Sequence, residues 1–192
     1  MIEIRRLNAA EGRRSLEALA AVLIDCVEGG ASVSFMTPLS PATAESFFRG
    51  ILDDVNNGDR ILLAAFDGSQ LVGTVQIVTA TPPNQPHRAD VAKLLVARAA
   101  RRQGIGELLM EQVEREGRQA GKTLLVLDTC AGGSAEKLYL RLGWKPAGVI
   151  PRYALYPDGT WCDTVIFWKD LTSRKLPACN WPKNIASRGR SC

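Results

Sequence analysis

The feature that most restricts the fold of this chain is an unbroken apolar run from Leu124 to Leu127. The run lies in the segment from Lys122 to Asp128 and shows no polar alternation, so a strand made from it is covered on both faces. Such a strand lies inside a sheet that has helices on each side. The segment therefore predicts an α/β fold.

Periodicity elsewhere supplies the other elements. Apolar residues recur at helical spacing after Ser15, an expected N-cap, until Gly29 and Gly30 end the pattern. The tetrad Asp67-Gly68-Ser69-Gln70 has the composition of a hairpin turn. In chain order we expect strand 2–7, helices 16–27 and 41–55, strands 60–66, 71–79 and 89–96, helix 104–120, strand 122–128, helix 134–142, and strands 144–150 and 161–169. This order favours a mixed sheet with helices on both faces.

Composition indicates one ordinary globular domain. The chain has 192 residues, 46% hydrophobic and 23% charged, and no apolar stretch of the roughly 18 residues that span a membrane. We therefore expect a cytoplasmic protein without membrane contact.

The net charge of +4 is concentrated at one end of the sequence. Five of the 24 basic residues and none of the 20 acidic ones follow Leu171, which leaves 19 basic against 20 acidic residues in the body. We expect a domain over 1–172, a flexible basic extension over 173–192, and no nucleic-acid partner.

Cysteine and histidine usage predicts no metal site. The five cysteines are scattered, and His87 is the single histidine. A zinc site needs three or four clustered nitrogen or sulfur ligands. Reduced thiols are the expected state.

A glycine-containing loop between an expected strand and an expected helix is the most informative stretch. It runs from Val96 to Gly106 and carries Arg98, Arg101 and Arg102. The first N–H groups of a helix lack intrahelical partners and the helix dipole adds positive potential, so this loop could hold a pyrophosphate. A tight strand-to-helix turn would show the same pattern. The chain lacks the GxxxxGK[ST] loop for nucleoside triphosphates and the third glycine of a dinucleotide site.

The pattern Arg101-x-x-Gly104-x-Gly106 after an apolar strand resembles the acetyl-CoA motif of GNAT N-acetyltransferases. The resemblance covers most of residues 2–170, through 88–96, 127–129, 135–139, 142–144 and 156–159. It implies a GNAT-like mixed, mostly antiparallel sheet with helices on both faces and a V-shaped split between strands 89–96 and 122–128. Acetyl-CoA, the acetyl donor, would bind there through Leu95, Val96, Arg101, Arg102, Gln103, Gly104, Ile105 and Gly106.

The segment 29–36 makes the chain similar, within that superfamily, to the tabtoxin-resistance acetyltransferase type. Three positions depart from the usual pattern. Arg98 stands where such loops often have proline, Arg102 where they often have glycine, and Asp90 where a glutamate is common.

Acetyl transfer to an amine requires a proton acceptor for the amine and a proton donor for the departing thiolate. The resemblance assigns Tyr139 as the general acid, although an aromatic core residue would suit the same position. Asp90 and Asp128 are the candidate bases. Asp128 ends a buried strand, where it could face a cleft or cap the next loop.

The resemblance places the acceptor between 29–36 and 152–158. Ser32, Phe35, Arg152 and Tyr153 are the expected acceptor-binding residues, with Arg152 either a carboxylate partner or an ordinary surface arginine. We expect a small-molecule amine as acceptor, an amino-acid-like toxin or antibiotic among the candidates. Acetylation of protein N-termini or lysines, and acyl-CoA sensing without catalysis, are the alternatives. The protein could be a monomer or a homodimer.

Overall fold

A computed structural model describes residues 1–172, and the expectations for 173–192 lie outside them. The strands are β1 (Ile2–Leu7), β2 (Arg60–Asp67), β3 (Gln70–Val78), β4 (Arg88–Val96), β5 (Leu124–Cys130), β6 (Lys145–Leu155) and β7 (Trp161–Asp170). The helices are α1 (Ala9–Arg14), α2 (Leu16–Glu28), α3 (Pro41–Asn57), α4 (Ile105–Gln119) and α5 (Ser134–Arg141), with a 3₁₀ turn, η1, over Arg98–Ala100. None of the described helices is both long and apolar enough to cross a membrane.

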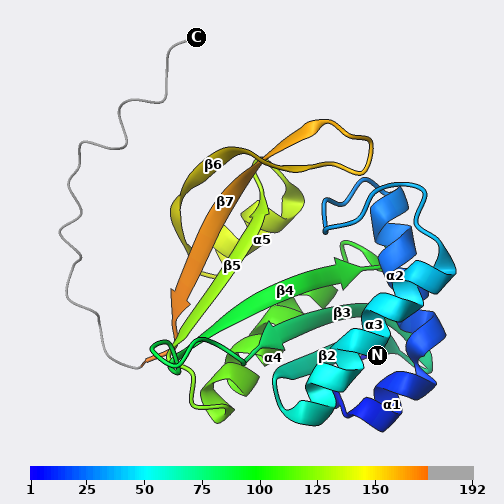
Figure 1. Ribbon diagram of the computed structural model, residues 1–192, viewed down its shortest axis with the longest axis horizontal. Helices are drawn as coiled ribbons and strands as arrows, with labels where there is room; N and C mark the ends of the chain where they lie inside the picture. Colours follow the sequence, from blue (N-terminus) through cyan, green and yellow to red (C-terminus); the bar gives the residue numbers. More distant parts are fainter. Residues whose placement is uncertain (173–192) are drawn as a thin grey trace.

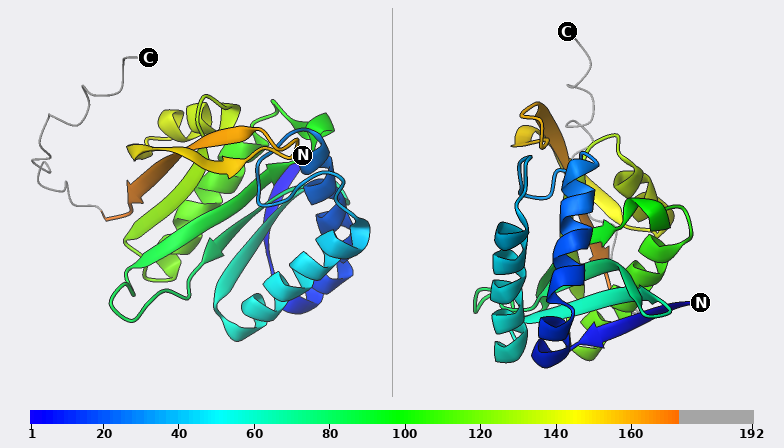
Figure 2. Two further views of the ribbon diagram at one scale, coloured as in Figure 1. Left: turned by 45° about the horizontal axis from the view of Figure 1, so that its top comes forward. Right: turned by 90° about the vertical axis from the view of Figure 1, so that its right-hand side faces the viewer.

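The strands form one sheet in the order β1-β2-β3-β4-β5-β7-β6. Only β4 and β5 pair in parallel, and every other neighbouring pair is antiparallel. Figure 2 shows α2 and α3 on one face of the sheet and α4 and α5 on the other. The mixed, mostly antiparallel sheet with helices on both faces is thus confirmed.

The sheet splits between β4 and β5. Pairing between these strands stops after Asp90 and Val126, only three residue pairs from where it begins. Beyond that point the strands diverge toward their carboxyl ends, as Figure 1 shows. This divergence is the V-shaped split expected from the sequence.

A β-bulge in β4 lies in the part of the strand that is paired with β3 but no longer with β5. Gln76 of β3 pairs with Ala92 and Thr74 with Leu95, so β4 has one residue more than β3 in this interval. An extra residue reverses which side chains face which side of the sheet. Accordingly, Val91 lies in the core beneath α4, whereas Leu95 lies in the core beneath α2 and α3.

Three local features differ from the sequence expectations. The short helix α1 was not expected, although Asn8 and Glu11 form a complete capping box at its start. Ser15 precedes α2 but makes no side-chain cap bond, because it also ends α1. Strand β6 continues past Ile150 to Leu155 through an irregularity in its pairing with β7.

Candidate functional site

The loop between β4 and α4 presents an uncapped helix N-terminus. Gly104 is the N-cap of α4, with φ of 79°, and no side chain bonds to the first turn. The N–H groups of the first turn therefore remain available to an anion. Arg102 also has a positive φ, 64°, in the conformation that a glycine adopts most easily.

The residues of this loop have different surroundings. Ile105 is buried in the core, so only its backbone could meet a ligand. A Cβ at Gly106 would come 3.1 Å from Leu138 Cδ2, which means that this glycine permits close packing of α4 on α5. Gln103 and Arg102 are exposed. The structure thus leaves backbone groups and the Arg102 side chain on the open side of the loop.

Replacing Gly104 with valine should raise the acetyl-CoA dissociation constant at least about tenfold, about 1.4 kcal/mol. A Cβ there meets no atom within 4 Å, so the penalty is the left-handed backbone, which costs an L-residue about 1–2 kcal/mol. Isothermal titration calorimetry measures the constant. Gly58→Val is the matched control, because Gly58 also caps a helix, at the C-terminal end of α3, with φ of 83° and open space around it. Equal constants for both variants and the parent would remove the loop from the site.

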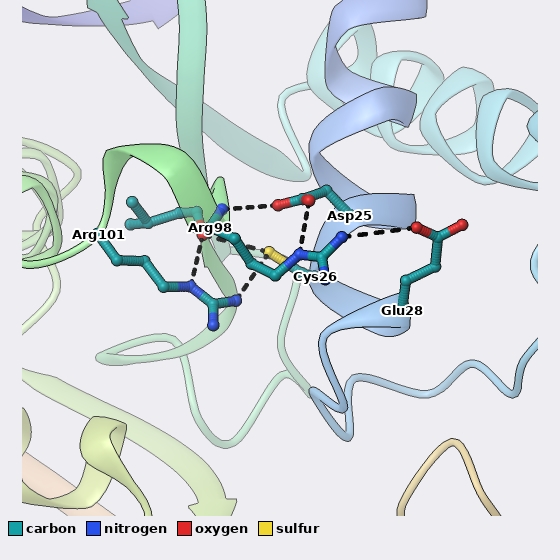
Figure 3. A network of polar contacts seen from close by, with 6 residues as sticks. Asp25, Cys26, Glu28, Arg98 and Arg101 are labelled. Atoms are coloured by element: carbon teal, nitrogen blue, oxygen red, sulfur yellow. Dashed lines mark hydrogen bonds and ion pairs between the residues drawn. The ribbon is translucent and has the colours of Figure 1, made fainter.

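A polar network joins the loop to α2, and Figure 3 shows it. Asp25 accepts from the Arg98 backbone N–H at 2.6 Å and from Arg98 Nε at 2.7 Å. Glu28 lies 3.7 Å from Arg98 Nη2. Burial of Asp25 opposes its charged form, but the bonds and charge of Arg98 outweigh burial and hold the pKa of Asp25 below its usual value. Arg98 therefore clamps the loop to α2.

Arg101 is also engaged within the protein. Its Nε donates to the Val96 carbonyl at 3.1 Å, and its Nη2 lies 3.8 Å from Cys26 Sγ. The Cys26 thiol donates to the same carbonyl at 3.4 Å, and burial raises the pKa of that thiol. Within residues 1–172, Arg102 is the one arginine of the three without an ion pair or a hydrogen bond from its side chain.

Leu95 and Val96 turn their backbone groups in opposite directions. The Ala97 N–H bonds to Val72 O, which makes these two residues a hydrogen-bonded pair between β4 and β3. Pairs alternate along antiparallel strands, so Leu95 bonds to β3 while the groups of Val96 face the split. Of the two residues, only Val96 has a backbone N–H directed toward a ligand between β4 and β5, and its carbonyl already accepts from Cys26 and Arg101.

Asp128 and Tyr139 flank the split on opposite faces of the sheet. Leu125 and Leu127 face the core beneath α4, so alternation turns Val126 and the exposed Asp128 toward the α2 and α3 face. Tyr139, on α5, lies on the other face. Asp128 comes two residues after the last β4–β5 pair, and its negative charge acts on Tyr139.

Tyr139 is both a core residue and a candidate proton donor. Its ring is 5% exposed and lies 5.9 Å, between centroids, from the rings of Trp144 and of Phe167. Burial, and secondarily the charge of Asp128, raise the pKa of Tyr139 above its usual value. The phenol therefore stays protonated at neutral pH, as a general acid must.

Asp90 has a different environment. It faces the same side as Asp128, since its register partner is Val126. Its carboxylate, however, forms an ion pair with Arg88, which also bonds to Gln85 at 2.8 Å. The two candidate bases thus differ in that Asp90 has a basic partner on its own strand.

The expected acceptor residues are only partly brought together. Ser32 donates to Leu155 O at 2.6 Å, and Phe35 packs edge-on against Phe47 of α3 with centroids 5.1 Å apart. Arg152 and Tyr153 are exposed on β6, which β7 separates from the split. The backbone N–H of Arg152 donates to Asp163 at 2.8 Å.

Within the expected segment 152–158, the residues that meet the acceptor loop, here 29–37, are the end of β6 and the turn that follows it. Besides the bond from Ser32 to Leu155, the Thr37 N–H and hydroxyl donate to Pro157 O at 3.3 and 3.0 Å. Figure 1 shows these two segments at the open end of the split. Tyr156 lies in this turn, and hydrogen bonding with the Cys162 thiol, followed by burial, raises the pKa of Tyr156 to about 12.

Lys93 is a site residue that the sequence reasoning missed. It is half-buried in the bulge of β4, and its Nζ donates to Ser34 of the acceptor loop at 2.7 Å. A signal was present, because Lys93 continues the alternation of Ala89 and Val91, which are buried. A lysine at an inward position of a strand is unusual enough to be noted.

Comparison with known proteins agrees with this geometry. The model of the acetyltransferase (GNAT) family matches residues 31–144, more than half of the chain. A ribosomal-protein-alanine N-acetyltransferase from Brucella melitensis shares the fold at 24% identity, with 88% of this chain and 99% of that chain covered and a TM-score of 0.73.

Two further structures show the same fold. A protein from Salmonella typhimurium, solved with its cofactor acetyl-CoA, has 16% identity over 93% of this chain and 99% of that one, with a TM-score of 0.74. A protein proposed to be a phosphinothricin N-acetyltransferase has 21% identity, over 90% and 99%, with a TM-score of 0.75. With the split sheet and the uncapped α4, the family match leads to one conclusion: the chain belongs to the GNAT family of acetyltransferases, enzymes that use acetyl-CoA.

Proposed function

We propose that this enzyme acetylates the amine of a small molecule, with Asp128 as proton acceptor and Tyr139 as proton donor. The observation that carries the proposal is the placement of these two side chains on opposite faces of the split sheet, close enough for the charge of Asp128 to act on Tyr139. Amine attack releases a proton and thiolate departure consumes one, so two separate groups on the two sides of the thioester suit the reaction.

The residues around the split fit acetyl-CoA. The first turn of α4, with Gln103 and Gly104, would hold the pyrophosphate through backbone N–H groups. Arg102 would add charge, and Val96 would pair with the pantetheine along the open edge of β4. The thioester supplies the acetyl group. Arg98 and Arg101 contribute by fixing the loop, since both side chains already have partners within the protein.

Asp128 is the better of the two candidate bases. It lies past the last β4–β5 pair, in the opening, whereas Asp90 is paired with Arg88 at the closed end. Asp128 does not cap the loop after β5, because within the described residues it makes no hydrogen bond to that loop. The Gly132 N–H of the loop donates to Glu136 instead. We therefore assign the proton acceptance to Asp128.

The acceptor loop favours a small acceptor. Residues 29–37 are hydrogen-bonded to Leu155, at the end of β6, and to Pro157 in the turn that follows. These contacts cross the open end of the split. An extended peptide would have to break these contacts. The amino-acid-like acceptors suggested by the tabtoxin-resistance resemblance and by the phosphinothricin relative suit this size. We further propose that residues 1–172 suffice for catalysis.

A thiol-release assay with acetyl-CoA and a panel of acceptors tests the proposal. The panel contains small primary amines, amino acids, a peptide with a free N-terminal alanine and an N-blocked lysine peptide. We expect kcat/KM for the best small amine to exceed that for either peptide by at least about 100-fold, about 2.7 kcal/mol. A better peptide would favour protein acetylation, as named for the Brucella relative. No turnover together with tight acetyl-CoA binding would favour an acyl-CoA sensor.

A further inference from the structure

Lys93 occupies a strained position in the opening of the sheet. Its φ of 55° is in the left-handed region, where an L-residue costs about 1–2 kcal/mol. The bulge shifts the alternation of side chains in β4, so that Leu95 lies beneath α2 and α3, and Lys93 reaches Ser34 in the loop that follows α2. Backbone strain of this kind persists only where the surrounding structure enforces it, and it often marks functional sites.

The ammonium of Lys93 connects β4 to the acceptor loop. Its Nζ donates to Ser34 Oγ at 2.7 Å, across 59 residues of sequence. Ser34 itself has a φ of 76°, so two strained L-residues meet at this bond. The contact holds the middle of the acceptor loop against the open half of β4.

Charges from two other strands act on the same ammonium. Asp128 of β5 stabilises the charged form of Lys93, while Arg60 of β2 opposes it. Burial is the larger effect and lowers the pKa of Lys93. Tyr139 is a further titratable group near Asp128, from α5. Lys93 thus bonds to a hydroxyl of the acceptor loop and is also affected by the charge of the carboxylate assigned as proton acceptor.

We infer that Lys93 is a positioning residue of acetyl transfer: its ammonium holds Ser34 and attracts the Asp128 carboxylate, which fixes the acceptor loop and the proton acceptor relative to each other across the split. This inference rests on the proposed role of Asp128. A purely structural lysine would hold the loop but would have no electrostatic link to Asp128.

An NMR titration tests the electrostatic link without turnover. The ¹⁵Nζ signal of Lys93 is followed against pH in the full-length parent, in Asp128→Asn and in Asp90→Asn. Since coupling between two titrating groups is reciprocal, loss of the Asp128 charge must lower the Lys93 midpoint. Asp90→Asn is the matched control and should leave the midpoint in place, because Asp90 is paired with Arg88. If the titration midpoint of Lys93 is the same in Asp128→Asn as in the parent, the inference is overturned.

Kinetics test the positioning. Lys93→Met should lower kcat at least about tenfold and move the acidic limb of the pH–rate profile to higher pH, because a positive charge beside the proton acceptor is lost. Lys93→Arg should keep the acidic limb in place. Ser34→Ala should raise the KM of the acceptor and should also leave the acidic limb in place. If Lys93→Met changes only KM, as Ser34→Ala does, Lys93 is structural and the inference fails. A parent without turnover would contradict the proposed function. The NMR titration would still show whether Lys93 and Asp128 are electrostatically coupled.

Discussion

Replacing Tyr139 with phenylalanine is expected to lower kcat by about 10² or more while acetyl-CoA affinity stays within about twofold. Loss of a general acid costs 10² to 10⁴ in rate. Phenylalanine keeps the ring that packs against Trp144 and Phe167, so the fold should survive. Stopped-flow or steady-state thiol release measures kcat, and calorimetry measures the affinity.

The pH profile provides a second check on Tyr139. Its raised pKa keeps the phenol protonated through the ordinary tyrosine value of about 10. Ionisation of Tyr139 should therefore remove no activity between neutral pH and about pH 10. A parent rate that falls steeply around pH 8 through loss of this proton, or a Tyr139→Phe variant as fast as the parent, would show that another group protonates the thiolate.

Replacing Asp128 with asparagine should lower kcat by about 10² and abolish the acidic limb of the pH–rate profile. An amide keeps the shape of the side chain but cannot accept a proton from the attacking amine. The side chain is exposed, so the change should affect stability by no more than about 0.5 kcal/mol. Steady-state rates between pH 5 and 9 measure both effects.

Asp90→Asn is the control for this prediction, since it removes a carboxylate from the same face of the sheet. We expect this variant to keep the acidic limb. The reverse pattern, in which Asp90→Asn loses the limb and Asp128→Asn keeps it, would reassign proton acceptance to Asp90. If both variants retain the parent profile, the amine loses its proton to solvent.

Local sequence patterns predicted a mixed sheet with helices on both faces, and the family resemblance added the mostly antiparallel pairing and the split. The apolar run of β5 required cover on both faces, and the glycines around α4 marked a strand-to-helix turn. Each of these signals spans only a few residues and reflects burial or backbone conformation. The fold class and the order of the main elements followed from them, and Asn8 with Glu11 could also have revealed α1.

Long-range contacts were the part that local patterns could not supply. The clamp from Asp25 to Arg98 joins residues 73 positions apart, and the bond from Lys93 to Ser34 joins residues 59 apart. The bulge depends on the register between β3 and β4, which single-strand alternation does not contain. For the same reason the sequence did not show that β7 lies between the split and β6, the strand that carries Arg152.

The most direct test of the account is transfer of a labelled acetyl group to a small amine. With [¹³C]acetyl-CoA and the best amine of the panel, the account predicts one labelled N-acetyl product for each free CoA thiol released. It also predicts that Asp128→Asn and Tyr139→Phe each reduce both signals together by about 10². Thiol release without labelled amine, or labelled amine formed equally well by the two variants and the parent, would contradict acetyl transfer at this split.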